Sequence, residues 1–216
     1  GVYIDEVPSA VRTITGVSTS VTGFIGRARR GPVNRATVIH GFGDFERVFG
    51  GLWAQSAMSY AVRQYFQNGG GTAVIVRVHG ATAATSGIAL GNGVTLAAAN
   101  AGDWGDQLRA RVDLNTSNAA DATLFNLSVK DLATGTVETH RNLSTIAASK
   151  RFATQVLADE SSLVRVTAIP AQPPATPVPA AGATDFEDGP TGQASNAIVA
   201  NGGADDTGAL ADTAVL

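Results

Sequence analysis

The chain has 216 residues, which is enough for one large domain or two smaller ones, each with its own core. Charged residues make up only 15% of the sequence and the net charge is −3, which disfavours a general nucleic-acid binder because such proteins need a concentrated basic face. The absence of cysteine excludes disulfides, cysteine-ligated metal sites and a cysteine nucleophile.

The N-terminal segment is a short run of β-forming residues that ends at Pro8. It is too short to form a stable element alone, so it pairs either within the chain or with a sheet of another subunit. The residues of this candidate arm are Gly1, Val2, Tyr3, Ile4, Asp5, Glu6 and Val7. We assign residues 1–16 to the arm and a lead into the first domain.

Residues 17–80 predict the first part of a core domain. The β-branched and aromatic residues of 20–27 predict a strand, and the Gly31-Pro32 pair predicts a turn over residues 28–34. A second short strand is expected over residues 36–40.

Two helices and a buried strand follow in the same region. Asp44 is a candidate N-cap for a short helix that ends at Gly50, and Ser56 is a candidate N-cap for a longer helix. The longer helix has an apolar stripe formed by Met58, Ala61, Val62, Tyr65 and Phe66. The apolar run at residues 72–78 predicts a buried strand. The order strand, helix, strand implies a βαβ crossover and a partly parallel sheet, hence a mixed α/β or α+β fold.

Residues 81–169 predict a second, mostly antiparallel β domain. Period-two patterns and turn residues place strands at 94–98, 108–114, 124–129, 136–143 and 162–169. One helix is expected within residues 149–160. Five prolines predict an extended linker over residues 170–179. Residues 180–216 have few large side chains, so a loop or disordered stretch is expected there, and we expect the polypeptide to continue beyond it.

The most charged motif is the arginine-rich turn after the first strand. The glycines at 26 and 31 have the spacing of a phosphate-binding loop, but Pro32 replaces the lysine and no helix is expected to follow. We therefore expect no nucleotide there. Arg27, Arg29 and Arg30 either form ion pairs with an acidic surface of a neighbouring subunit or lie in a solvated turn.

No pattern of residues predicts a catalytic, cofactor-binding or metal site. The histidines at 40, 79 and 140 are far apart in sequence, and no GxSxG motif occurs. Asp103 and Asp106 flank Trp104 and Gly105, a pattern that turn chemistry explains better than metal binding. The acidic residues of the C-terminal region are expected to be solvated, namely Asp185, Glu187, Asp188, Asp205 and Asp206. We expect a protein that is not an enzyme and has no cofactor.

Several segments in order resemble the N-terminal part of contractile tail sheath proteins, the sheath subunits of contractile bacteriophages and phage-tail-like injection systems. The segments are GVYIDEVPS, GVSTSVTGFIGRARRGPVN, FGDFERVFGGLW, YAVRQYFQNGGGTAVIVRV and ANAGDWGDQLRARVD. The resemblance covers residues 1–169, and its motifs are specific only in combination.

The resemblance implies a structural subunit that polymerises as stacked hexameric rings around an inner tube. Terminal arms add strands to sheets of neighbouring subunits, so strand exchange completes the fold, and contraction drives the tube through a target envelope. The implied partners are other sheath subunits, the inner tube protein, and baseplate and tail terminator proteins, with neither nucleic acid nor direct membrane insertion. Assembly in the bacterial cytoplasm is implied. Residues 1–7 would be the donated arm and residues 81–169 a domain inserted towards the outside of the subunit.

Two other readings of the sequence remain as alternatives. A non-catalytic, β-rich adhesion or binding module of a surface or secreted assembly explains the Thr- and Ala-rich strands, but it does not explain the βαβ segment. A nucleotide-using enzyme is disfavoured by the broken phosphate loop.

Overall fold

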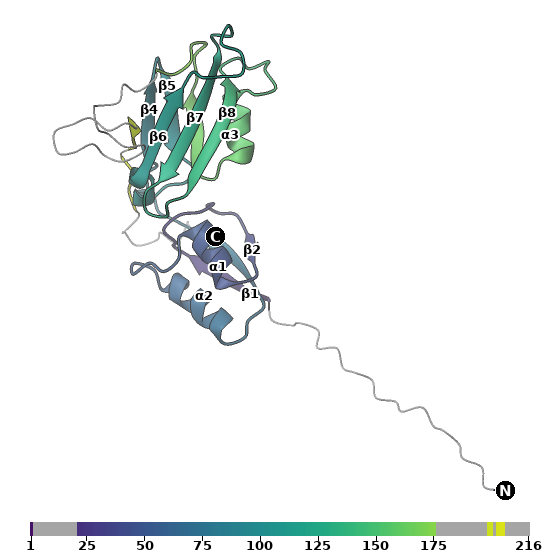
Figure 1. Cartoon of the computed structure of the whole chain (residues 1–216). Helices are drawn as coiled ribbons and strands as arrows, with labels where there is room; N and C mark the ends of the chain where they lie inside the picture. Colours follow the sequence, from purple (N-terminus) through teal and green to yellow (C-terminus); the bar gives the residue numbers. More distant parts are fainter. Residues whose placement is uncertain (2–20, 176–197, 201, 206–216) are drawn as a thin grey trace.

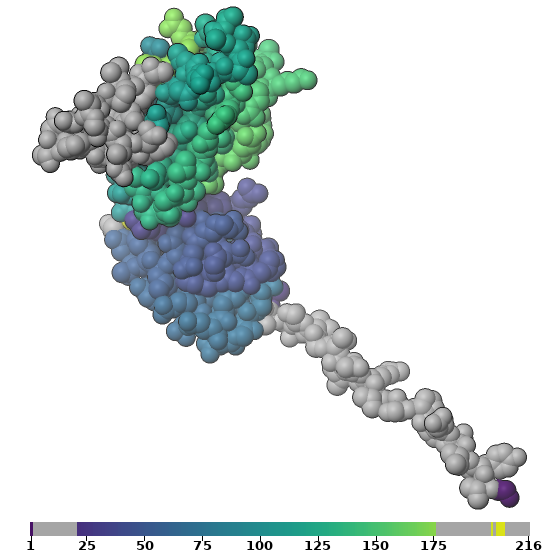
Figure 2. All heavy atoms as spheres, viewed as in Figure 1, coloured from purple at the N-terminus to yellow at the C-terminus, as the bar shows by residue number. Residues whose placement is uncertain are grey.

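The computed structural model describes residues 1, 21–175, 198–200 and 202–205. Apart from Gly1, they form two lobes in contact with each other (Figure 2). The first lobe contains residues 21–80, and the second lobe contains residues 81–175 together with the described part of residues 198–205. Each lobe has its own cluster of buried apolar side chains. The domain boundaries after residues 16, 80 and 169 remain predictions.

The first lobe is built on a three-stranded sheet in the order β1-β3-β2. β1 (Val21–Gly26) pairs in parallel with β3 (Thr72–Arg77), and β2 (Thr37–Ile39) pairs antiparallel with the other side of β3. Each of these strands lies where the β-branched and aromatic pattern predicts one. β3 is the central strand and is paired on both edges, and its residues alternate between buried and half-buried.

Two helices between β2 and β3 cover one face of this sheet (Figure 1). They are α1 (Phe42–Phe49) and α2 (Ala57–Gln67). Phe45 and Phe49 of α1 stack with ring centroids 5.3 Å apart, and both are fully buried. Val62 of α2 shares their apolar cluster with Ile75 of β3. Burial of these large side chains, each contributing roughly 1.5–3 kcal/mol, is the main stabilisation of the lobe.

The helix ends confirm two predicted positions and correct one. The Ser56 hydroxyl accepts a hydrogen bond from the Met58 backbone N–H, so Ser56 is the N-cap of α2. Gly50 ends α1 in the left-handed conformation with φ 87°. The prediction that Asp44 caps α1 is wrong, because the helix begins at Phe42. The Asp44 carboxylate lies within the first turn and accepts the backbone N–H of His40.

The second lobe contains two antiparallel sheets, in the orders β10-β6-β7-β8 and β4-β5-β9. The strands are β4 (Gly87–Gly91), β5 (Val94–Ala98), β6 (Leu108–Asp113), β7 (Leu124–Asp131), β8 (Val137–Ser144), β9 (Val164–Ala168) and β10 (Ile198–Val199). A 3-10 helix, η1 (Asp103–Gln107), precedes β6, and α3 (Ala153–Glu160) precedes β9. Apolar side chains from both sheets, including Leu96, Leu108 and Phe125, form one core.

Two strands of the second lobe differ from the sequence-based expectation. β4 lies in a stretch of small residues where no strand was predicted. β10 pairs with the edge of β6, and Ala200 is buried in the core, so the expectation of a loop is wrong for residues 198–200. The reason is that strand pairing uses backbone groups, and few side chains are needed to extend an existing edge. Overall, the described residues form a mixed α+β fold. None of the described helices is long and apolar enough to span a bilayer.

Candidate assembly surfaces

The face of the three-stranded sheet opposite the helices is apolar and open. Ala73 and Ile75 of β3 point towards the helices and are buried. On the other face, Val21 and Ile25 of β1 are 59% and 63% exposed, and Val38 of β2 is 56% exposed. Sheets with parallel strands are normally covered on both faces. Among the described residues nothing covers these three side chains, so this open face is a candidate surface for a partner.

The outer edge of β1 is also open. In the sheet order β1-β3-β2, β1 is an edge strand, and no described strand pairs with its outer side. A groove of about 380 Å³ follows this edge between β1 and α2, with Phe24, Met58 and Ala61 among its lining residues. An exposed edge of this kind offers unpaired N–H and C=O groups to an added strand.

The predicted N-terminal arm, residues 1–7, lies almost entirely outside the described residues. Of its seven residues only Gly1 is described, and it is exposed and outside any helix or strand. Residues 2–7 lie outside the described residues.

The three arginines of the predicted inter-subunit patch have different surroundings. Arg27 is half-buried, and its carbonyl accepts a 2.6 Å hydrogen bond from the Ser56 hydroxyl. Nε of Arg29 lies 3.9 Å from Asp103, and both side chains are substantially exposed. Nη1 of Arg30 lies 3.2 Å from Oδ2 of Asp131, with both side chains largely buried. The structure therefore does not bring the three side chains together as one exposed basic group, and Arg30 has a partner in its own chain.

An arginine that the sequence analysis did not single out joins the two lobes. Arg77, the last residue of β3, is 3% exposed. Its guanidinium donates hydrogen bonds of 2.9, 2.9 and 2.7 Å to the carbonyls of Ala28, Gly31 and Ala101. Burial lowers the pKa of Arg77 to about 10, while the negative charge of Asp205 acts in the opposite direction. The sequence feature that could have identified Arg77 is the period-two alternation of β3. It puts residue 77 on the same inward face as Ala73 and Ile75.

Asp103 and Asp106 belong to the 3-10 helix η1, in agreement with the turn chemistry expected for them. Oδ1 of Asp106 accepts hydrogen bonds from the Ser86 hydroxyl and the Gly203 backbone N–H. The Asp103 backbone N–H donates to Oδ1 of Asp205. Burial and the charge of Asp205 raise the pKa of Asp103. The expectation that Asp205 is a solvated tail residue is thus wrong, because residues 202–205 return to η1.

The histidines lie apart in space as well as in sequence. His40 is exposed and its Nδ1 lies 3.4 Å from the Thr72 hydroxyl, and Nδ1 of His79 contacts the Gly80 carbonyl at 2.7 Å. His140 is buried, with Nε2 3.5 Å from Oε2 of Glu138, an ion-pair distance without a hydrogen bond. Within the part of the chain that the structure describes, no group of three or more His, Asp or Glu side chains could hold a metal ion.

Glu138 is the most strongly perturbed carboxyl group of the second lobe. It accepts hydrogen bonds from the Ser161 hydroxyl and from both the backbone N–H and the hydroxyl of Ser162. Burial opposes its ionisation, but the His140 imidazole and these donors outweigh burial and lower the pKa of Glu138 to about 2. These contacts tie β8 to the end of α3, so this site is structural.

No model of a known protein family matches the sequence, and no curated protein is similar to it. Two of the solved structures that share its fold are sheath tail proteins. The sheath tail protein from Listeria innocua aligns over 86% of this chain and 34% of its own, with 14% identity and a TM-score of 0.55. The sheath tail protein from Desulfitobacterium hafniense aligns over 100% of this chain and 41% of its own, with 14% identity and a TM-score of 0.52.

These matches define the class of fold. The chain has the fold of a part of two sheath tail proteins, and it spans about two fifths of their length or less.

Proposed function

We propose that this chain is part of a structural subunit of a contractile sheath. The observation that carries the proposal is the open, apolar β1 edge and face, in a fold shared with two sheath tail proteins. The described residues leave Val21, Ile25 and Val38 exposed, and contacts within a polymer can bury them. The subunits would form stacked hexameric rings around an inner tube, ending at baseplate and tail terminator proteins.

The links between subunits would be strands donated by residues 1–7. Backbone pairing suits such links because it does not depend on matching side chains and survives rotation of the subunit. Residues 8–20 separate this arm from β1, which leaves length for the subunit to turn while the arm stays attached.

Contraction requires no catalytic step. One subunit can adopt two packings whose free energies differ by on the order of a few kcal/mol. Added over many subunits, this difference drives contraction. Surfaces with few charges favour such repacking, because fewer buried ion pairs must exchange partners. The proposed subunit is therefore not an enzyme, takes no cofactor, and is assembled in the bacterial cytoplasm as part of a phage tail or a phage-tail-like particle.

Among the arginines of the predicted patch, Arg29 is the best candidate for an ion pair between subunits. Its side chain is 40% exposed and its contact with Asp103 is long, so an acidic partner can approach it. Arg30 is already paired with Asp131, so charge reversal there would disturb the subunit itself. Reversal at Arg29 tests stacking more cleanly.

Negative-stain electron microscopy of the full-length protein tests the proposal. Striated tubes or cogwheel-shaped rings are the expected result. A monodisperse population of single particles over a wide concentration range would instead favour the alternative of a β-rich adhesion or binding module.

A further inference from the structure

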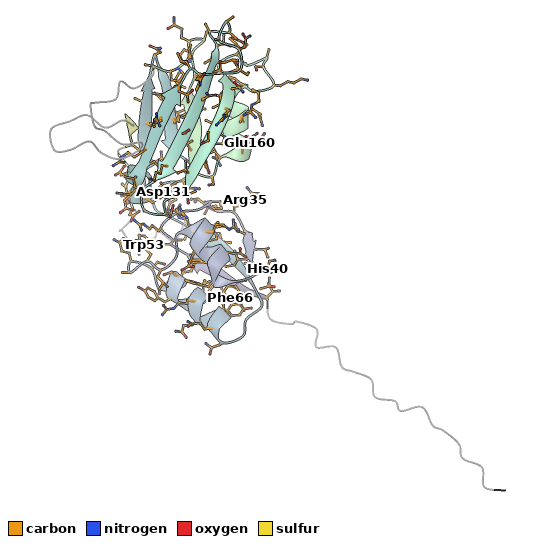
Figure 3. All side chains as sticks on the ribbon, in the orientation of Figure 1. Arg35, His40, Trp53, Phe66, Asp131 and Glu160 are labelled. Atoms are coloured by element: carbon orange, nitrogen blue, oxygen red, sulfur yellow. The ribbon has the colours of Figure 1, made fainter. Side chains whose placement is uncertain are left out.

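A cleft of about 520 Å³ lies between the two lobes, and its charged lining is entirely positive. Four arginines line it, namely Arg30, Arg35, Arg47 and Arg165. None of the described residues that line it is Asp or Glu. Figure 3 shows Arg35 and Asp131 at the level where the two lobes meet. A chain with a net charge of −3 thus concentrates positive charge in one hollow.

Two of these arginines have carboxylate partners among the described residues, and two do not. Arg30 pairs with Asp131, and Arg47 pairs with Asp44 at 3.1 Å. Nη1 of Arg165 donates only to backbone carbonyls, at 2.7–3.2 Å. Arg35 is exposed and its side chain forms no ion pair with any described residue. The cleft therefore attracts anions, and the attraction is strengthened because its walls exclude water from one side of the charges.

The remaining lining favours a peptide over a small inorganic anion. Trp104, Val48 and Leu163 give the cleft an apolar wall beside the arginines. The Trp104 ring also lies 5.9 Å from the Arg30 guanidinium. A ligand that fills the cleft should carry at least one large apolar side chain next to carboxylates, since both kinds of surface are offered together.

Among the segments of the chain that combine a large apolar side chain with carboxylates, residues 185–188 have the highest density of carboxylates. Residues 185–188 are Asp-Phe-Glu-Asp, with three carboxylates around one aromatic side chain. We propose that this segment of a second copy of the chain binds the cleft, with its carboxylates at Arg35 and Arg165 and Phe186 against the apolar wall. The identity of the partner rests on the proposed function, because it makes the cleft a contact between sheath subunits.

The proposed function favours a second copy over the same chain, because a polymer needs contacts between its subunits. The described residues on either side of the segment are Ala175, whose N–H donates to the Leu90 carbonyl of β4, and Ile198 of β10. Insertion of the segment into the cleft of its own chain is the competing arrangement, which sedimentation velocity distinguishes from binding between two copies.

The test uses a labelled synthetic peptide of residues 181–192 and fluorescence anisotropy. The receptor is the full chain with the segment neutralised by D185N, E187Q and D188N, so that it cannot compete. We expect saturable binding that weakens with salt and falls by on the order of tenfold in the background of R35E. R141E is the matched control, because Arg141 is an exposed residue of β8 beyond the cleft. Equal binding of the peptide by the R35E receptor would refute the assignment of the cleft as its binding site.

Three further measurements separate the remaining outcomes. A peptide with the three neutral substitutions should not bind, and equal binding would refute the role of the carboxylates. Full displacement by inorganic phosphate alone would indicate a small-anion site and refute the peptide. Sedimentation velocity of the unmodified chain should show self-association that R35E weakens. A monomer throughout, together with peptide binding only to the neutralised receptor, would place the segment in its own chain and overturn the second-copy assignment.

Failure of this contact and failure of the proposed function give different results. Tubes seen by electron microscopy without peptide binding would remove the cleft contact and leave the sheath proposal standing. Peptide binding without tubes would remove the sheath proposal and leave the cleft contact standing.

Discussion

The guanidinium of Arg30 in the first lobe forms an ion pair with the carboxylate of Asp131 in the second lobe, with 3.2 Å between Nη1 and Oδ2. The same carboxylate accepts hydrogen bonds from the Ala133 backbone N–H and the Thr134 hydroxyl. The pair therefore fixes the turn after β7 against the turn after β1, two segments 101 residues apart in sequence.

Substitution of Asp131 by Asn should destabilise the protein by about 3 kcal/mol, because it leaves a largely buried Arg30 charge without its partner. The double variant R30M/D131N should recover part of the loss, since no unpaired charge then remains. Urea unfolding of the four proteins of this double-mutant cycle measures the coupling between the two residues. Strictly additive losses would show that the pair does not hold the lobes together.

Even a conservative substitution of Arg77 should lower the stability of the protein. Lysine keeps the charge but offers its donors from a single nitrogen, so it cannot reach the carbonyls of Ala28, Gly31 and Ala101 together. We expect R77K to lower the free energy of unfolding by about 2–4 kcal/mol, corresponding to two lost hydrogen bonds with buried acceptors. R141K is the control for the same change on the surface. Unchanged urea midpoints for R77K would contradict this role.

The sequence predicted the elements of the first lobe well, because their signals are local. Ser56 and Gly50 mark helix ends by their own backbone and side-chain chemistry, and the apolar run of β3 has strong β propensity. Asp44 was misplaced because an acidic residue near a helix start can serve either as the cap or in the first turn.

The contacts that join the lobes were not predictable from local patterns. The partner of Arg30 lies in a turn of the other lobe, and nothing near either residue in the sequence identifies the pair. β10 carries only two β-branched residues in an Ala- and Gly-rich region, and it forms because β6 offers it an edge. The arginine-lined cleft likewise requires residues from several separate segments.

Glu138 should make the stability of the second lobe depend on pH in the acid range. Its pKa is lowered in the folded state from about 4.5 to about 2, so its stabilising contribution is complete above about pH 4.5 and is lost as the pH falls towards 2. E138Q should cost about 1–3 kcal/mol near neutral pH, and the difference from the parent should shrink on acidification. Urea midpoints across this range measure it, with the exposed E46Q as the surface control. A difference that stays constant with pH would refute the assignment.

The open face of the first sheet should matter for assembly and not for folding. Replacing Val21 and Ile25 by Thr should change the free energy of unfolding by no more than about 0.5 kcal/mol, because both side chains are exposed. If assembly buries them, the concentration needed for polymerisation should rise on the order of tenfold or more, since a fully buried aliphatic side chain contributes roughly 1.5–3 kcal/mol. Light scattering against concentration measures this.

Val137, which is 50% exposed on β8, provides the matched control for this pair of substitutions. V137T should polymerise at the concentration of the parent protein. An equal effect of V137T would show that loss of any exposed valine weakens assembly and that the β1 face has no special role.

The central claim is that subunits are linked into a sheath through the N-terminal arm. Negative-stain electron microscopy of the full-length protein with and without residues 1–7 tests it most directly, with circular dichroism of the shortened protein as the check on folding. We expect tubes or rings from the intact protein and folded, unassembled particles from the shortened one. Normal tubes from the shortened protein would contradict it.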